Sequence, residues 1–269
     1  MKKLRLLTAV LSLVAGQALA QTDTIFTNNE KIACQVREIT EDAVKFVYPG
    51  EDVPNSLYKN SILKIVFKSG RVQTFSQATT LPQVNNVDDF DKVTVTAVEG
   101  EIKGLYKLGD VSAKAVGTTE LSNQERVKKR AYNKLKIQAA LMGANIVFLT
   151  HQRTEGNRIG YWESKSAETN LSGVAYTNIL PDYEAFAALI REHESAPMSI
   201  TQEAYLSNTA SDLSKYAKNK EFRIEGIENS NGLILVNGDY RVTSFDDKGF
   251  NLYQRTKSKS SNFRIEFGQ

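Results

Sequence analysis

The chain has 269 residues, with 34 Lys and Arg, 31 Asp and Glu and a formal net charge of +3. Three of the positive charges, on Lys2, Lys3 and Arg5, lie near the start, and no acidic residue accompanies them before Gln21. The rest of the chain is close to neutral and lacks the bulk positive charge that is typical of nucleic-acid-binding proteins. We therefore expect no nucleic acid among its partners. The length predicts two or three modules with ordinary cores.

The first twenty residues have the features of a secretory signal peptide. The basic start is followed by an apolar stretch, 6–15, and then by the small residues Ala18 and Ala20, which fit the pocket of a signal peptidase. An uncleaved membrane anchor is the alternative, but the apolar stretch is shorter than the roughly 18 to 20 residues that span a bilayer. We expect cleavage after Ala20, no transmembrane span after processing, and a periplasmic or secreted protein.

The single cysteine, Cys34, excludes an internal disulfide. It does not directly follow the apolar stretch of the signal peptide, so lipid anchoring through an acylated cysteine is not expected either. Cys34 lies on the apolar side of the alternating run 32–36. This pattern predicts a buried thiol in a β module and not a reactive one.

Residues 21–78 are expected to form a small β-barrel-like module. Apolar residues alternate along several short stretches, and turns such as Pro49-Gly50 separate them, which is typical of hairpins in an SH3-like or Sm-like barrel. The strand at 31–36 and the ending at 62–72 resemble a β module common near the N-termini of exported proteins from Bacteroidetes-type bacteria. This resemblance implies a bacterial envelope setting and no particular chemistry.

A polar stretch, 79–91, is predicted to be a linker to an α/β domain at 92–180. Ser122 and Glu125 have the spacing of a capping box at a helix start. Apolar residues then recur at helical spacing up to Gly143, which fits a left-handed C-terminal cap. The apolar run directly after this helix predicts a buried strand beneath it.

The helix and strand at 131–149, with the turn Gly143-Ala144-Asn145 between them, resemble the small α/β envelope domains that include the Rcs-type outer-membrane stress sensor. The resemblance implies a later strand at 173–176. The chain has no cysteine pairs like those of the sensor, so no signalling role is carried over.

The remainder of the chain predicts a helical connector at 181–198 and a C-terminal β module at 199–269. Turn sequences such as Asn231-Gly232 and Asn237-Gly238 separate short apolar runs, which favours an antiparallel sheet or a partial barrel. The predicted fold class is therefore α+β, with a small N-terminal β-barrel-like module, a central α/β domain carrying one main helix on a sheet, and a C-terminal antiparallel β module.

Two candidate binding features lie in the central domain. The segment 151–170 is predicted to be a long hairpin loop that carries Tyr161 and the only tryptophan, Trp162. Aromatic residues on loops are enriched at binding hot spots, although the Trp162 ring packing back on the sheet is an equal alternative. The predicted helix also carries a basic side, which favours an anionic partner or simply a solvated surface. Its candidate binding residues are Arg126, Lys129 and Lys136.

No catalytic motif is present. The sequence has neither a phosphate-binding glycine loop nor a nucleophile elbow, and it has only two histidines. His151 follows the predicted buried strand, where a side chain can reach a cleft, so a hydrolase with a site assembled around His151 remains the alternative function. Residues 192–194 include three potential metal ligands, but adjacent residues on a helix point in different directions, and no metal site is expected.

These features predict an exported bacterial envelope protein that acts as a non-catalytic binding or structural module. The partner is expected to be an envelope component, either a protein or an anionic glycan or lipid. No cofactor is expected.

Overall fold

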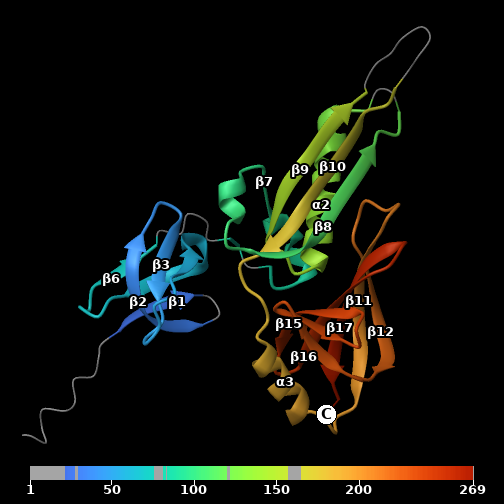
Figure 1. Ribbon diagram of the computed structural model, residues 1–269. Coiled ribbons are helices and arrows are strands. Elements are labelled where there is room, and N and C mark those ends of the chain that lie inside the picture. Colours follow the sequence, from blue (N-terminus) through green and yellow to red (C-terminus); the bar gives the residue numbers. More distant parts are fainter. Residues whose placement is uncertain are drawn as a thin grey trace, which may run out of the picture. The chain divides into compact units, whose positions relative to one another are not determined.

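The computed structural model describes residues 22–27, 30–75, 81–82, 84–119, 122–156 and 165–268. The chain divides into two compact units, Met1–Ser76 and Gln77–Gln269, and each is described by itself. The described part is mostly β, with three sheets and few helices (Figure 1). The predicted signal peptide lies outside the described residues.

The first unit is a six-stranded antiparallel sheet with the strand order β4-β3-β2-β1-β5-β6. Alternating apolar residues on its strands form one buried core. The two edge strands, β4 and β6, do not pair with each other, so the sheet does not close within the described residues and the predicted barrel-like shape is not confirmed. The elements are β1 (Asp23–Thr27), β2 (Lys31–Ile39), β3 (Ala43–Val47), β4 (Asn55–Tyr58), the 3-10 turn η1 (Lys59–Ser61), β5 (Ile62–Val66) and β6 (Val72–Thr74).

Cys34 is fully buried on β2, as the alternating pattern predicted. Burial, with a smaller contribution from the negative charge of Asp23, raises the pKa of the Cys34 thiol to about 11. The Asp23 carboxylate is itself buried and accepts hydrogen bonds from the backbone N–H groups of Val36, at 2.9 Å, and Lys68, at 2.8 Å. This buried carboxylate therefore fastens β1 to β2 and to the turn after β5.

The second unit begins with a four-stranded sheet in the order β7-β9-β10-β8, in which β7 runs parallel to β9 and the other pairs are antiparallel. The long helix α2 packs along one face of this sheet (Figure 1). One main helix on a sheet is the arrangement that the sequence predicted for this region. The elements are η2 (Val87–Lys92), β7 (Thr94–Thr96), η3 (Glu99–Ile102), β8 (Tyr106–Val116), α2 (Gln124–Leu141), β9 (Ile146–Glu155) and β10 (Glu168–Thr177).

Helix α2 begins one residue later than predicted. Its N-cap is Asn123, whose side chain accepts a hydrogen bond from the N–H of Arg126 at 3.1 Å. The Ser122 hydroxyl instead accepts from the N–H of Thr119 at 3.0 Å, within the turn that precedes the helix. The predicted capping box at Ser122 is therefore wrong, because the preceding turn already uses the serine oxygen.

The C-terminal end of α2 agrees with the prediction. Gly143 has a φ of +75°, the left-handed conformation that favours glycine at this position. Its N–H donates to the carbonyl of Ala140 at 2.9 Å, and the N–H of Ala144 donates to the carbonyl of Ala139 at 2.9 Å. This pair of hydrogen bonds is a Schellman motif, and it turns the chain directly into β9.

The stretch 79–91, which was expected to be a linker, contains a structured element. Within its described part, η2 packs against α2, and Val87 is buried in the core of the second unit. Val84 and Phe90 pack against the same core. These apolar residues lie three positions apart among polar ones, which places them on one side of a short helical turn. Because most residues of the segment are polar, its average composition gave no sign of this apolar side.

The C-terminal sheet has seven antiparallel strands in the order β12-β11-β17-β16-β15-β14-β13, and its edge strands do not pair within the described residues. The predicted connector helix, α3, packs against it through the fully buried Phe186. The Asp182 side chain caps α3 by accepting from the N–H of Ala185 at 2.7 Å. The elements are α3 (Tyr183–Glu192), β11 (Met198–Ser207), β12 (Ser214–Phe222), β13 (Ile227–Ser230), β14 (Leu233–Val236), β15 (Tyr240–Asp246), β16 (Gly249–Arg255) and β17 (Lys259–Phe267).

Side chains of the C-terminal sheet cap the end of α2, which joins the predicted central and C-terminal modules into one unit. Arg241, on β15, is buried and donates to the carbonyls of Leu108, at 2.7 Å, and Met142, at 2.9 Å. Asn262, on β17, donates to the carbonyl of Leu141 at 3.1 Å. The final carbonyls of a helix lack partners within the helix, and here a guanidinium and an amide supply them.

Candidate functional site

A polar groove lies where the C-terminal end of α2 meets the C-terminal sheet. It has a narrow part, a cavity of about 60 Å³, and a wide part of about 290 Å³. The two parts are neighbours, because they share lining residues. We call the whole the amide groove. The shared residues are Val84, Asn85, Gly143, Thr243 and Ser244.

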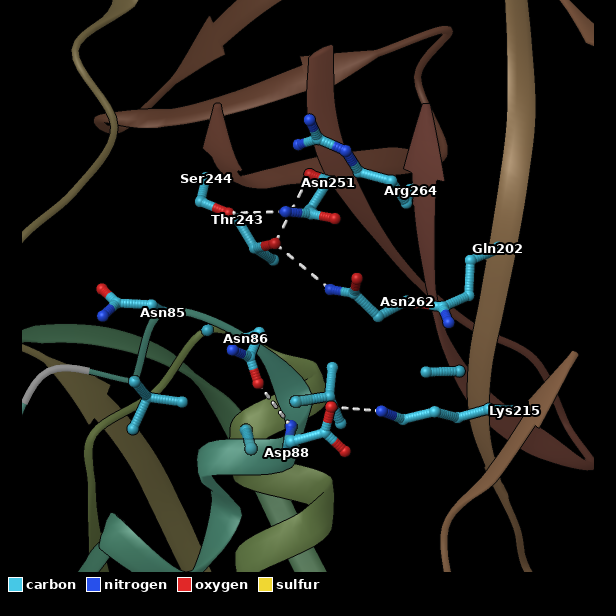
Figure 2. Close-up of a pocket in the computed structure, with 15 residues that line it drawn as sticks. Asn85, Asn86, Asp88, Gln202, Lys215, Thr243, Ser244, Asn251, Asn262 and Arg264 are labelled. Carbon is cyan, nitrogen blue, oxygen red and sulfur yellow. Dashed lines mark hydrogen bonds and ion pairs between the residues drawn. The ribbon is translucent and has the colours of Figure 1, made fainter. Parts of the chain in front are cut away.

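Figure 2 shows the narrow part, with side chains of the C-terminal sheet on one side and the segment at η2 on the other. On the sheet side, the Asn251 amide donates to the Ser244 hydroxyl at 2.9 Å, and the Asn262 amide donates to the Thr243 hydroxyl at 3.2 Å. On the other side, Asp88 forms an ion pair with Lys215 of β12. Hydrogen bonds and an ion pair therefore hold the polar wall of the narrow part in place.

The wide part combines a polar wall and an apolar wall. Amides, hydroxyls and one carboxylate form the polar wall, whereas aliphatic and aromatic side chains form the apolar one. Its described lining contains no Lys, Arg or His. Besides the shared residues, the wide part is lined by Asn145, Thr177, Asn178, Ile179, Leu180, Pro181, Asp182 and Phe245.

Asn145, in the polar wall of the wide part, is held in a fixed orientation by hydrogen bonds. It is only 4% exposed, and its backbone N–H donates to Tyr176 while its carbonyl accepts from Thr94. The side-chain Nδ2 donates to Asn178 Oδ1 at 2.5 Å. Asn145 Oδ1, in contrast, has no hydrogen-bond partner among the described residues. A buried acceptor without a partner costs about 1–3 kcal/mol. This oxygen is itself buried, so it is not exposed to the groove.

Comparison with models of known protein families, with curated proteins and with solved structures finds no significant match to this chain. Among the described helices, none is both long and apolar enough to cross a bilayer.

The basic side of α2 lies apart from the groove, and part of it is used within the fold. Arg126 and Lys129 are exposed, as expected for an anionic partner. Lys136 donates to the carbonyl of Asp91 at 2.9 Å, and burial lowers its pKa. Lys134 is buried and donates to the carbonyl of Asn208 at 2.7 Å. The surface available to an anion is therefore smaller than the sequence pattern suggested.

Tyr161 and Trp162 lie outside the described residues. Fewer residues than predicted separate the two strands, because β9 continues to Glu155 and β10 begins at Glu168. The two strands pair antiparallel throughout this length. The predicted pair of antiparallel strands is therefore confirmed. Both ends of the segment 151–170, which was expected to be loop, belong to these strands.

Neither histidine lines the amide groove. His151 is exposed within β9 and lies opposite Ser172 of β10, so the expectation that the strand ends before it is wrong. The His193 ring stacks on Phe267 with 4.0 Å between ring centroids, and its Nδ1 lies 3.0 Å from the carbonyl of Leu189. In the described part of the chain, no three or more His, Cys, Asp or Glu side chains group as a metal site would.

Sequence reasoning missed the groove because its residues come from distant segments, between Val84 and Arg264. No short motif contains them. One local signal was available at Asn145, an amide at the start of an otherwise apolar buried strand. A buried amide in such a position needs partners for its oxygen and its nitrogen, which is a reason to expect a polar site nearby.

Proposed function

We propose that this chain is an exported protein of the bacterial envelope that acts by binding and not by catalysis, and that the amide groove is its binding site. Export is supported by the N-terminal pattern of basic, apolar and small residues. Binding is supported by the groove in the second unit, where fixed polar groups converge on an open space.

The observation that carries this proposal is the lining of the wide part of the groove, where amides and hydroxyls adjoin aliphatic and aromatic side chains. A volume of about 290 Å³ is near the lower end of the range for small-molecule sites, roughly 300–1,000 Å³. The groove therefore fits a small ligand, or one unit of a larger one.

The chemistry of the lining favours binding over catalysis. A nucleophilic hydroxyl needs a base within hydrogen-bond reach, and the described lining of the groove contains no histidine. The Thr177 hydroxyl donates to the carbonyl of Ile179 at 2.9 Å, and the Thr243 hydroxyl donates to that of Asn251 at 3.4 Å. These hydroxyls are thus held by the backbone and have no base to activate them.

A thermal-shift screen tests the proposal. The exported chain is heated with a panel of neutral sugars, amino sugars, acidic sugars, amino acids and short peptides, beside the variant Ile179→Trp. Ile179 is 37% exposed and lines only the wide part, so the larger ring occupies the space of the ligand. The control, Val116→Trp, makes a similar change at a 43% exposed position on β8, outside the groove.

We expect a ligand that stabilises the wild type and the Val116→Trp variant but not the Ile179→Trp variant. At a hundred times its dissociation constant, the stabilisation is about 2.7 kcal/mol. If no compound distinguishes the wild type from Ile179→Trp, the groove is not a binding site of this kind and the proposal fails.

A hydrolase built around His151 is the second candidate. One observation favours it: His151 lies directly opposite Ser172 in the β9–β10 register, which places a base beside a hydroxyl. Hydrolysis of activated esters by the wild type, abolished by His151→Ala and by Ser172→Ala separately, would support this candidate. Equal rates in the wild type and both variants would exclude it.

A further inference from the structure

The C-terminal sheet ends in a long edge strand, β12 (Figure 1). An edge strand presents a row of backbone N–H and C=O groups without a strand partner, so a further extended segment can pair with it. Two other edge strands of the second unit, β7 and β13, have three and four residues and offer few such pairs. The two long edge strands are β8, with 11 residues, and β12, with nine.

Side chains of the fold already occupy the backbone of β8. Three guanidinium groups donate to its carbonyls, and one amide oxygen accepts from one of its N–H groups. These groups belong to Arg130, Arg241, Arg255 and Gln138. At β12, in contrast, only β11 hydrogen-bonds to the backbone among the described residues. In the described part of the second unit, β12 is therefore the long edge that is open to a partner.

Positive charge gathers along one face of β12. Tyr216, Lys218 and Lys220 alternate along the strand and so share a face. Lys218 and Lys259 both pair with the one buried carboxylate of Glu203, which leaves one of the two positive charges uncompensated. Lys220 is exposed and forms no ion pair with a described residue. A segment with negative charges would thus be attracted to this face.

The other charges of β12 are already paired. Lys215 forms an ion pair with Asp88, and Glu221 forms one with Arg223. Of the β12 residues, only Lys215 lines the described part of the amide groove. The open edge and the groove are therefore different surfaces.

An exposed aromatic ring lies on the same face as the lysines. The Tyr216 ring is 55% exposed and stacks on Tyr205, with 5.7 Å between the ring centroids and 12° between the ring planes. Lys259 Nζ lies 4.6 Å from the centre of the Tyr205 ring. Side chains of an added strand stand opposite those of β12, so this edge offers a place for an apolar side chain between places for acidic ones.

The charges also distinguish between possible occupants of the edge. If a second copy paired antiparallel with its own β12 about the middle of the strand, Lys218 would oppose Lys218, and like charges directly opposite each other are destabilising. Lysines on an edge strand hinder such self-pairing. They attract a strand that carries Asp or Glu at alternate positions.

We propose that β12 is a docking edge for an extended acidic segment of a partner protein, which adds to the C-terminal sheet as a further strand. Its acidic side chains lie beside Lys218 and Lys220, and an apolar one lies on Tyr216. This docking edge is separate from the amide groove and goes beyond the proposed function.

The experiment uses a fluorescent peptide of alternating Glu and Val residues, as long as β12, and the exported chain. Anisotropy measures the affinity at low and high salt, and a peptide with Lys in place of Glu and the anionic glycan polygalacturonate serve as comparisons. The variants are Lys220→Glu and the matched control Lys129→Glu, at an exposed position on α2. Ile179→Trp obstructs the groove and leaves β12 unchanged. Thermal unfolding verifies that each variant is folded.

We expect the acidic peptide to bind the wild type more weakly as salt is added, and Lys220→Glu to weaken binding by about fivefold, because an attraction becomes a repulsion. Lys129→Glu and Ile179→Trp should leave the affinity unchanged. The Lys peptide should bind Lys220→Glu more tightly than it binds the wild type. Hydrogen exchange followed by nuclear magnetic resonance should show that the bound peptide protects amides at alternate positions of β12, as a new row of strand hydrogen bonds requires.

Four results would overturn the proposal. The first is no binding of the acidic peptide, or equal affinity for the acidic and Lys peptides, which would make the lysines a protection of the edge only. The second is binding without protection of β12 amides, which excludes strand addition. The third is equally tight binding of polygalacturonate with the same loss in Lys220→Glu, which would make the partner an anionic glycan. The fourth is loss of peptide binding in Ile179→Trp, which would place the peptide in the groove.

Discussion

Glu203 should govern how the second unit responds to acid. It lies on β11, is 3% exposed, and accepts hydrogen bonds from Lys259 Nζ at 2.5 Å and Ser261 Oγ at 2.8 Å. Lys218 forms a second ion pair with the same carboxylate. Burial by itself raises the pKa of Glu203, but the hydrogen bonds from Lys218, Lys259 and Ser261 outweigh it and lower the pKa to about 2.

The size of the effect follows from the difference between this pKa and the usual value of 4.5. That interval corresponds to a stabilisation of about 3 kcal/mol when the carboxylate is charged. Because the pKa is lower in the folded state, the stabilisation is fully present above about pH 4.5. The stabilisation is lost as the pH falls from about 4.5 towards 2, because the Glu203 carboxylate of the folded protein becomes protonated near pH 2.

Urea unfolding between pH 7 and pH 2.5 tests this reasoning with the wild type, Glu203→Gln and the control Glu228→Gln, at an exposed position on β13. At pH 7 we expect Glu203→Gln to lower the free energy of unfolding of the second unit by up to about 3 kcal/mol. The difference from the wild type should shrink as the pH approaches 2. A difference that is below about 1 kcal/mol at pH 7, or that stays constant with pH, would refute the role given to the three hydrogen bonds.

Three other predictions concern separate parts of the chain. Arg241→Met should destabilise the second unit by about 2–4 kcal/mol in urea unfolding, because two buried carbonyls lose a charged donor. An unchanged urea midpoint would contradict the role of Arg241 in holding the end of α2 to the C-terminal sheet. Cys34 should react with thiol reagents only after unfolding, since burial keeps the thiol protonated; rapid labelling of the native protein would contradict this. Mass spectrometry of the exported protein should find Gln21 at the N-terminus, and recovery of the form that starts at Met1 would contradict cleavage.

The elements that could be predicted are those whose pattern is local. Strand β2 alternates apolar and polar residues at a period of two, and α2 combines helical spacing with the Gly143 cap, so both follow from neighbouring residues. Strand β12 carries no such local signal, because almost all of its residues are exposed and no apolar alternation marks it. It is an edge strand, and its pairing with β11 defines it.

The amide groove was beyond sequence reasoning for a related reason. Its lining comes from η2, the turn after α2, and strands of the C-terminal sheet, and these meet near the place where Arg241 and Asn262 cap α2. These contacts join residues that are far apart in the sequence, so the local spacing of residues does not predict them. The basic side of α2 was visible in the sequence, but whether Lys136 points to solvent or to the carbonyl of Asp91 depends on the position of η2.

The most direct test of the binding account is to locate the ligand by nuclear magnetic resonance. Chemical shifts of the isotope-labelled chain are recorded while the best ligand from the thermal-shift panel is added. The account predicts that the largest shifts occur at Asn145, Ile179 and Thr243, including the side-chain amide of Asn145. Shifts centred on His151 or on Arg126, with the groove residues unchanged, would contradict it.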